Sequence, residues 1–367
     1  MVNTTTYYTD SPLETIQLGV RLGRLLRGGD VVLLFGDLGA GKTHFTKGIA
    51  EGSGITSLIK SPTYAYVNEY LIQNSKFPPR RAGKIQESRL DGNYLYHYDL
   101  YRMESGADLT SLGYEETIIQ SSAVNVVEWA DRLGDHLPSR YIRVDFAEEG
   151  DARSIAIAFH YPTRLSPSFI PAYYDEFQMP LHVRAHCGQV ASVAMQLAAA
   201  YVQQGDIVDI PLLYTAAMLH DLFRVCDFAM LDRAYFNEEI TDEKWAKWTA
   251  LREQYPHLHH ADIACGLFVE RGFLETAELI RLHKSLNLIL EPDSYDTLEK
   301  IILYYADKRV KHSQIVSLSE RFKDGRERNG KEDTPEERRL FESVEKETYI
   351  LEQTLFAPLD IDPEDIV

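Results

Sequence analysis

The feature that most constrains the fold is a short apolar run followed directly by a glycine-rich turn. Residues 31–35 read VVLLF and residues 36–43 read GDLGAGKT, with the helical stretch 44–51 behind them. A short, continuously apolar run indicates a strand buried on both faces, as in a parallel sheet. A strand, the pattern G-x-x-x-x-G-K-T and a helix in this order predict a phosphate-binding loop. We therefore expect the N-terminal part to be an α/β P-loop domain.

The glycine-rich loop predicts a nucleotide site. Its backbone N–H groups can surround a phosphate, and the N-terminus of the following helix attracts the same anion. Lys42 is expected to reach the β- and γ-phosphates, and Thr43 is expected to bind Mg²⁺. The predicted nucleotide contacts in and beside the loop are Gly36, Gly39, Ala40, Gly41, Lys42, Thr43 and His44.

Two acidic residues end later predicted strands. Asp99 closes the run YLYHYD, and Glu128 closes the run VNVVE. Because the carboxyl ends of strands in an open α/β sheet face the ligand, both carboxylates are expected to converge on the nucleotide and its metal ion. An ordinary surface acid at the end of a strand is the alternative for each.

The chain changes character near residue 162. Residues 1–160 mix strands with helices, whereas residues 161–180 contain four prolines and are interpreted as a linker. Beyond it we predict an all-α domain over 181–355 and an acidic tail over 356–367. Further N-terminal strands are expected near 63–71, 94–98, 124–127, 141–146 and 154–159. C-terminal helices are expected near 181–204, 211–225, 241–254, 260–271, 275–285, 296–312 and 334–355.

Charge and composition exclude several classes of protein. Residues 166–367 carry 21 basic and 36 acidic residues, a net charge of −15, which argues against non-specific nucleic-acid binding by this half. No apolar run approaches the roughly 18 residues of a membrane span. The polar N-terminus lacks the layout of a signal peptide, and three cysteines cannot form a disulfide framework, so a cytoplasmic protein without a membrane partner is expected.

Four motifs in the N-terminal half carry a resemblance to a known family. GDLGAGKT, SPTYAYVNEY, YHYDLYR and VVEWADRLG occur in this order and together resemble the TsaE (YjeE) family of P-loop ATPases. The resemblance implies ATP with Mg²⁺, TsaB- and TsaD-like partners, and a role in making threonylcarbamoyladenosine in tRNA, with tRNA contacted through that complex. By position it implies catalytic roles for Lys42, Asp99 and Glu128, metal contacts from Thr43 and Glu128, and nucleotide contacts from Thr63 and Trp129. The basic segment 73–93 is interpreted as a solvated loop, with a contact to tRNA or to a partner protein as the alternative.

A second set of residues lies in the C-terminal half. His220 and Asp221 follow the helical run LLYTAAML, with His186 upstream and Asp307 downstream on an apolar helix, where a charge is costly unless paired or ligated. The order H…HD…D resembles the HD superfamily of metal-dependent phosphohydrolases over about residues 180–325. The resemblance implies one metal on His186, His220, Asp221 and Asp307, and a second on His260 and His283 with Asp221 bridging.

These ligand types suit Fe, Mn, Zn or Mg, and two such ions would clamp a phosphate and activate water, with His220 and Asp221 central to catalysis. An ordinary surface or core histidine is the alternative for His260 and for His283. The sequence thus predicts a fusion of a TsaE-like ATPase with a phosphohydrolase acting on a nucleotide or phosphate ester. The alternative is an ATP-dependent regulator whose HD part senses a nucleotide or serves as a scaffold without turnover. A kinase is disfavoured, because no acceptor site is recognisable in 44–160.

Overall fold

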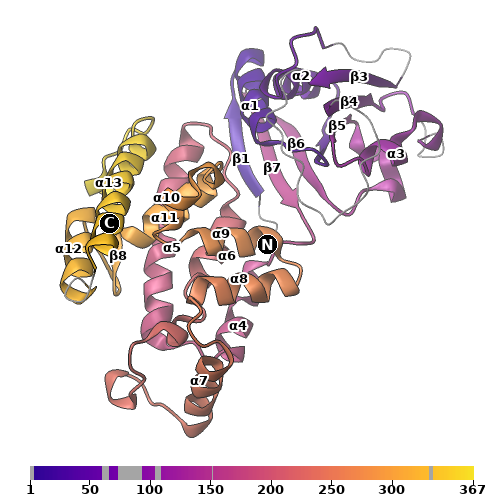
Figure 1. Cartoon of the computed structure of the whole chain (residues 1–367). Coiled ribbons are helices and arrows are strands. Elements are labelled where there is room, and N and C mark those ends of the chain that lie inside the picture. Colours follow the sequence, from indigo (N-terminus) through magenta and orange to yellow (C-terminus); the bar gives the residue numbers. More distant parts are fainter. Residues whose placement is uncertain (1–3, 60–65, 73–92, 104–108, 151, 330–333) are drawn as a thin grey trace. The chain divides into compact units, whose positions relative to one another are not determined.

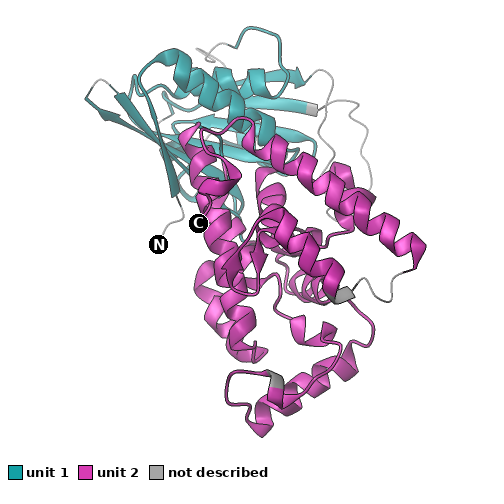
Figure 2. Cartoon of the chain, turned by 90° about the vertical axis from the view of Figure 1, so that its left-hand side faces the viewer, with its two compact units in different colours: residues 1–162, 205–207 teal, residues 163–204, 208–367 magenta. Residues whose placement is uncertain are grey.

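The computed structural model describes residues 4–59, 66–72, 93–103, 109–150, 152–329 and 334–367. Thr63 and nearly all of the basic segment 73–93 lie outside these residues. The chain forms two compact units, one of residues 1–162 with 205–207 and one of residues 163–204 with 208–367 (Figure 2).

A seven-stranded sheet forms the centre of the described part of the N-terminal unit, with strand order β1-β7-β6-β2-β5-β4-β3 (Figure 1). Strand β2 is parallel to β5 and β6, and β4 is parallel to β5, whereas β1–β7, β6–β7 and β3–β4 are antiparallel. The predicted strands correspond to β2 to β7, and β1 was not predicted. The strands are β1 (Thr4–Thr9), β2 (Val31–Phe35), β3 (Val67–Ile72), β4 (Asn93–Asp99), β5 (Ala123–Glu128), β6 (Tyr141–Glu149) and β7 (Ala152–His160).

Helices α1 (Pro12–Leu25) and α2 (Lys42–Gly52) pack against each other through glycines. A Cβ atom on Gly19 would lie 2.3 Å from the Phe45 carbonyl oxygen, and one on Gly48 would lie 2.0 Å from the Ile16 carbonyl oxygen. Any side chain at these two positions would push the helices apart. Helix α2 begins at Lys42, so this contact fixes the helix that carries the end of the phosphate loop. The short helix α3 (Tyr114–Ile118) and the turn η3 (Ala130–His136) complete the unit.

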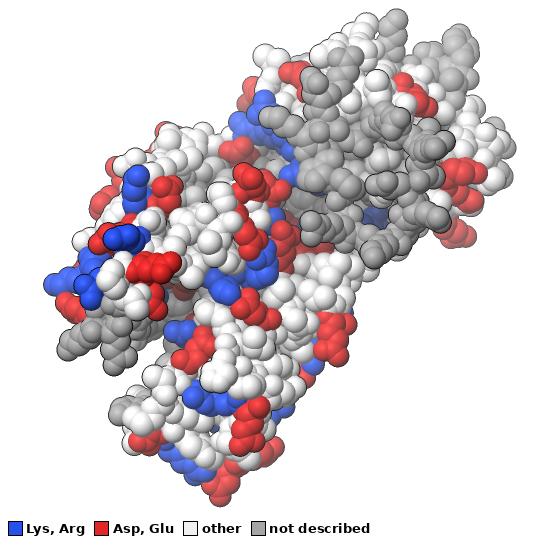
Figure 3. Space-filling view, in the orientation of Figure 1, with Lys and Arg blue, Asp and Glu red and all other residues white. Residues whose placement is uncertain are grey.

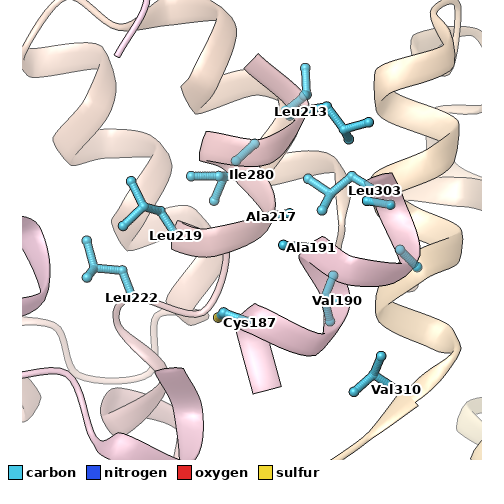
Figure 4. Close-up of a cluster of buried hydrophobic side chains, with 14 of the residues drawn as sticks. Cys187, Val190, Ala191, Leu213, Ala217, Leu219, Leu222, Ile280, Leu303 and Val310 are labelled. Carbon is cyan, nitrogen blue, oxygen red and sulfur yellow. The ribbon is translucent and has the colours of Figure 1, made fainter. Parts of the chain in front are cut away.

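The C-terminal unit is helical, apart from a two-stranded hairpin of β8 (Val310–Lys311) and β9 (Gln314–Ile315), which was not predicted. Its core is apolar and surrounds α5 and α6 (Figure 4), with Leu213, Ala217 and Ile280 wholly buried. The helices are α4 (Ile170–Glu176), α5 (Leu181–Gln203), α6 (Ile210–Leu219), α7 (Asp242–Gln254), α8 (His260–Glu270), α9 (Leu274–Leu282), α10 (Asn287–Leu290), α11 (Leu298–Lys308), α12 (Leu318–Asn329) and α13 (Pro335–Phe356). The predicted helices correspond to α5, α6, α7, α8, α9, α11 and α13, while α4, α10 and α12 were not predicted.

Two segments differ from the sequence-based expectation. The stretch 161–180, interpreted as a linker, contains α4, whose Ile170 and Tyr173 are buried in the core of the helical unit. The stretch 356–367, interpreted as an acidic tail, buries Phe356 and Ile366. Both segments therefore belong to the helical unit, because each carries apolar side chains that fill its core. No helix of the described residues is long and apolar enough to cross a membrane.

Candidate functional sites

The phosphate loop joins β2 to α2, as the sequence predicted. Gly36 and Gly41 have φ angles of 138° and 107°, in a region that side chains disfavour. A Cβ atom on Gly36 would also lie 2.7 Å from the Phe146 carbonyl oxygen. The Lys42 ammonium donates to the carbonyl oxygens of Gly36 (2.6 Å) and Asp37 (2.8 Å). The lysine is thus folded into the loop, at the place where a phosphate would be enclosed.

Glu128 lies at the centre of a buried polar group at the end of β5. Its carboxylate accepts hydrogen bonds from the hydroxyls of Thr43 (2.8 Å) and Thr46 (2.9 Å), and its Oε1 lies 2.9 Å from Nε2 of His97. Burial would raise the pKa of Glu128, but these hydrogen bonds and the His97 charge hold it below the ordinary value. Glu128 is therefore ionised and held next to the hydroxyl of Thr43, as a Mg²⁺ site in a P-loop requires.

Asp99 and Trp129 lie beside this group. Asp99 pairs with Glu128 in the β4–β5 register, so the two predicted acids end neighbouring parallel strands. The Lys42 ammonium lies 3.7 Å from the centre of the Trp129 ring, within range of a cation–π interaction. Trp129 has a φ of 61°, a conformation that non-glycine residues rarely adopt.

Burial lowers the pKa of Lys42. Burial also lowers the pKa of His44, so the His44 ring is neutral.

Gly39 and Ala40 lie in the same turn of the phosphate loop, where the Ala40 N–H donates to the Asp37 carbonyl (3.3 Å).

The sequence analysis did not identify His97 and Thr46 as site residues. Both lie at buried positions of a strand or a helix. From the sequence alone, a polar residue at such a position cannot be told from one that only completes hydrogen bonds within the core. The only available signal was that His97 precedes Asp99 by two positions and so shares its face of the strand.

The second site is a histidine–aspartate cluster in the helical unit. The structure brings together all six residues predicted there, from five different helices or the residues just after them. They are His186 on α5, His220 and Asp221 after α6, His260 at the start of α8, His283 after α9, and Asp307 on α11.

One part of the cluster surrounds Asp307. Its Oδ1 lies 3.2 Å from Nε2 of His186 and 3.6 Å from Nε2 of His220. Asp221 Oδ2 lies 3.8 Å from Nε2 of His186. These four residues are the set that the sequence assigned to a first metal.

The other part surrounds the second oxygen of Asp221. Asp221 Oδ1 lies 2.8 Å from Nε2 of His260 and 3.7 Å from Nε2 of His283. The two histidine Nε2 atoms lie 3.0 Å apart. Asp221 thus contacts His186 of the first part through Oδ2 and the second part through Oδ1, which also lies 3.8 Å from Nε2 of His220. The carboxylate therefore lies between the two parts, where a bridging ligand would lie.

The second ring nitrogen of each histidine supports a metal site. Nδ1 of His186 lies 2.8 Å from the His312 carbonyl oxygen, Nδ1 of His220 lies 2.8 Å from that of Ala217, and Nδ1 of His283 lies 2.5 Å from that of Ile280. A ring that donates from Nδ1 presents the lone pair of Nε2, which is the arrangement of histidines that bind metals. Nε2 of His220 is buried and has no hydrogen-bond partner among the described residues. The donor set therefore fits one or two divalent metals.

His260 and Asp307 are each held by a neighbour that the sequence did not reveal. Asp227 accepts from the backbone N–H of His260 (3.1 Å) and contacts its Nδ1. The Lys308 ammonium donates to Oδ2 of Asp307 (2.5 Å) and to the His283 carbonyl (3.1 Å). Asp307 thus keeps only Oδ1 for the histidines.

Both aspartates of the cluster are ionised. Burial would raise the pKa of Asp221, but the charges of His220 and His260 hold it well below the ordinary value. Burial would also raise the pKa of Asp307, but the charge of Lys308 and the hydrogen bonds of His186 and His220 hold it well below the ordinary value. A histidine binds a metal only without its Nε2 proton, so a divalent ion would replace the positive charge that His220 and His260 otherwise supply to these carboxylates.

Comparison with known proteins identifies the N-terminal part. A family model described as "Threonylcarbamoyl adenosine biosynthesis protein TsaE" matches residues 9–155. The chain is 37% identical to a tRNA threonylcarbamoyladenosine biosynthesis protein TsaE from Bacillus subtilis over 143 residues, which are 39% of this chain and 77% of that protein. It is 36% identical to the TsaE protein of Nostoc over 152 residues (40% and 82%), and 35% identical to that of Treponema pallidum over 149 residues (40% and 96%).

A crystal structure of Bacillus subtilis YdiB matches with 31% identity and a TM-score of 0.33, covering 44% of this chain and 88% of that one.

Proposed function

Because the chain belongs to the TsaE family through residues 9–155, we propose that its N-terminal unit is a Mg²⁺-dependent ATPase that supports threonylcarbamoyladenosine formation in tRNA. TsaB- and TsaD-like proteins are its proposed partners, and tRNA is reached through their complex. The observation that carries the ATPase role is the contact between Thr43 and Glu128, which unites the end of the phosphate loop with an ionised carboxylate.

The residues of the loop act through charge and position. Lys42 exchanges its two carbonyl partners for the β- and γ-phosphates of ATP, and Trp129 holds the lysine stem in place until then. Glu128 and Thr43 would hold Mg²⁺, which would neutralise charge that develops on the phosphates. Asp99, one strand away from Glu128, orients the attacking water. His97 and Thr46 fix the carboxylate of Glu128, so they act as positioning residues.

The test of this role is ATP hydrolysis by the full chain, measured alone and with TsaB- and TsaD-like proteins added. Lys42→Ala is expected to abolish hydrolysis in both settings. Asp145→Asn, which changes an exposed carboxylate of β6 paired with Arg143, is the control and should keep the native rate. Hydrolysis that survives Lys42→Ala would contradict the assignment.

For the helical unit we propose an HD-type metal-dependent phosphohydrolase that acts on a nucleotide or phosphate ester. The observation that carries it is the convergence of four histidine Nε2 atoms on two ionised aspartates, with Nδ1 of each ring already engaged. His186, His220 and Asp307 would hold one ion, His260 and His283 the other, and Asp221 would bridge them. Ions held there would polarise a phosphate and lower the pKa of a bound water.

Arg224 contributes positive charge at the edge of the cluster. Its Nε lies 3.9 Å from Oδ2 of Asp221, and its side chain is 37% exposed. The guanidinium can therefore donate a hydrogen bond to a phosphate oxygen of a ligand that enters from solvent. Lys308 is buried and already paired with Asp307, so it orients that carboxylate instead of contacting substrate. The chain thus supplies metal ligands on one side and, on the other, a partly exposed guanidinium held by Asp227 and His260.

The test is a hydrolysis screen on the full chain carrying Lys42→Ala, which removes the ATPase background. The protein is loaded with Mn²⁺ or Fe²⁺ and offered nucleotides and simple phosphate esters. Turnover that disappears in His220→Ala supports the hydrolase. Two ions bound per chain without any turnover would favour the alternative role, in which the helical unit senses a nucleotide or serves as a scaffold. A chain that binds no divalent ion would contradict both.

A further inference from the structure

Three aromatic rings lie together next to the histidine–aspartate cluster. His182 lies 5.9 Å from Phe228, at an interplanar angle of 26°, and 5.6 Å from Phe236, while the two phenylalanines lie 6.1 Å apart. We refer to His182, Phe228 and Phe236 as the aromatic shelf. Trp248 supports it from below, because its ring lies 4.7 Å from Phe236 and is wholly buried.

The shelf is open to solvent on one side. Phe228 and Phe236 are half-buried and His182 is exposed, while Met230, two residues after Phe228, is 60% exposed. A ring cluster that served only the core would be covered, as Trp248 is. The space-filling view shows a hollow between the lobe with α7 and the lobe with α12 and α13 (Figure 3).

The segment that carries the shelf is held firmly. The Leu181 N–H donates to Oε1 of Glu238 (2.7 Å), which ties the segment to the first turn of α5. The Arg252 guanidinium donates to the Phe228 carbonyl (2.7 Å), and the Trp248 indole donates to the Gln178 carbonyl (2.8 Å). The rings are therefore preorganised, and a ligand would lose little free energy by ordering them.

Both ends of the shelf continue directly into the cluster. His182 lies one helical turn before His186 on α5, about 6 Å along the helix axis. Phe228 directly follows Asp227, which holds His260. A ligand with a phosphate at the cluster and one sugar in between therefore has an aromatic surface within reach of its other end.

We propose that the aromatic shelf holds the nucleobase of a nucleotide whose phosphate lies at the histidine–aspartate cluster. This inference rests on the proposed phosphohydrolase function and narrows its substrate class from phosphate esters to nucleotides. A nucleobase of any kind can stack on an aromatic ring, because every base has a π-face. Burial lowers the pKa of His182, so its ring is neutral and adds a third stacking surface without repelling the metals. Arg224 and the metals supply the positive charge that matches the phosphate.

The test compares AMP with ribose 5-phosphate, which carries the same phosphate and sugar but no base. Binding of each is measured by calorimetry to the Mn²⁺-loaded full chain carrying Lys42→Ala, so that the phosphate loop does not contribute. AMP is expected to bind about fivefold or more tightly than ribose 5-phosphate. Phe228→Leu and His182→Leu keep apolar volume but remove the ring, and each should reduce this ratio by about fivefold. Ile350→Ala, an exposed position on α13, is the matched control and should keep the ratio.

The outcomes separate the two proposals. Equal affinity for AMP and ribose 5-phosphate, or a ratio unchanged in both leucine variants, overturns the shelf while the phosphohydrolase stands. Failure of the metal-loaded chain to bind either compound overturns both. An apolar peptide that binds the native shelf, is lost in Phe228→Leu and does not compete with AMP would also overturn the nucleobase assignment. Melting temperature and Mn²⁺ content are checked in each variant, so that a folding defect is not mistaken for lost stacking.

Discussion

Asp227→Asn tests how the ligands divide between the two proposed metals. Asp227 contacts only His260 among the proposed ligands, through the backbone N–H and through Nδ1 of the ring. The amide of asparagine keeps one oxygen for the backbone but presents an NH₂ group to Nδ1. Nη1 of Arg224, a further donor, already lies 3.1 Å from the same nitrogen. Facing two donors, Nδ1 becomes an acceptor and the proton moves to Nε2, which then cannot bind a metal.

The expected loss is confined to one site. Removing such an outer partner typically weakens metal binding by about 10- to 100-fold, and the reversed tautomer favours the upper end. Mn²⁺ titration of metal-free chain should give two ions per native chain. The variant should give one ion with native affinity and one about 100-fold weaker, roughly 2.7 kcal/mol. Asp242→Asn, which changes an exposed carboxylate on α7, should behave like the native chain. Equal weakening of both ions, or of neither, would refute the division of ligands.

Three further changes test other parts of the molecule. Glu128→Gln should reduce the Mg²⁺ affinity of the ATP-bound chain by at least about tenfold, because it removes the negative charge held between Thr43, Thr46 and His97. An unchanged dependence of ATP hydrolysis on Mg²⁺ concentration would contradict this expectation. Gly19→Ala should lower the free energy of unfolding of the N-terminal unit by about 1–3 kcal/mol in urea denaturation, since its Cβ would lie 2.3 Å from the Phe45 carbonyl oxygen. Gly266→Ala, on α8 and with no atom within 4 Å of the added Cβ, is the comparison and should not destabilise the helical unit. Burial raises the pKa of Glu299, so its stabilising effect is present below the ordinary glutamate pKa and is lost as pH rises through the raised value. Glu299→Gln keeps an oxygen for the Asp209 N–H (2.6 Å) and should gain melting temperature over the native chain on going from about pH 5 to about pH 8; a difference that does not change with pH would count against the shift.

The local features of the fold could be predicted because they depend on neighbours in sequence. The strand before the phosphate loop, the helix after it and the paired ends of β4 and β5 follow from spacing alone. The histidine–aspartate cluster was found through resemblance, since its residues are far apart in the chain. His186 and Asp307 are 121 positions apart.

The prolines of 161–180 misled the prediction for a physical reason. Pro167 and Pro171 lie in the first turns of η4 and α4, and Pro180 is the N-cap of α5. Proline is favoured at the start of a helix, where no N–H is needed, so a cluster of prolines marks successive helix starts as readily as a linker. Asp227 was missed because it ends the short 3₁₀ helix η5 (Arg224–Asp227), six positions after Asp221, where no helical or strand periodicity connects the two.

If the histidine–aspartate cluster binds the proposed metals, its origin in five different helices makes the stability of the helical unit depend on the metal supply. One proposed ion would join ligands from α5, α11 and the end of α6, and the other would join ligands from α8 and the ends of α6 and α9, which the unfolded chain would separate. At a free concentration about 1,000 times its dissociation constant, such an ion adds roughly 4 kcal/mol to stability, comparable to the whole margin of many domains. The N-terminal unit has its own sheet and core and owes nothing to that ion. During metal starvation, we therefore expect proteases to cleave the helical unit before the N-terminal unit.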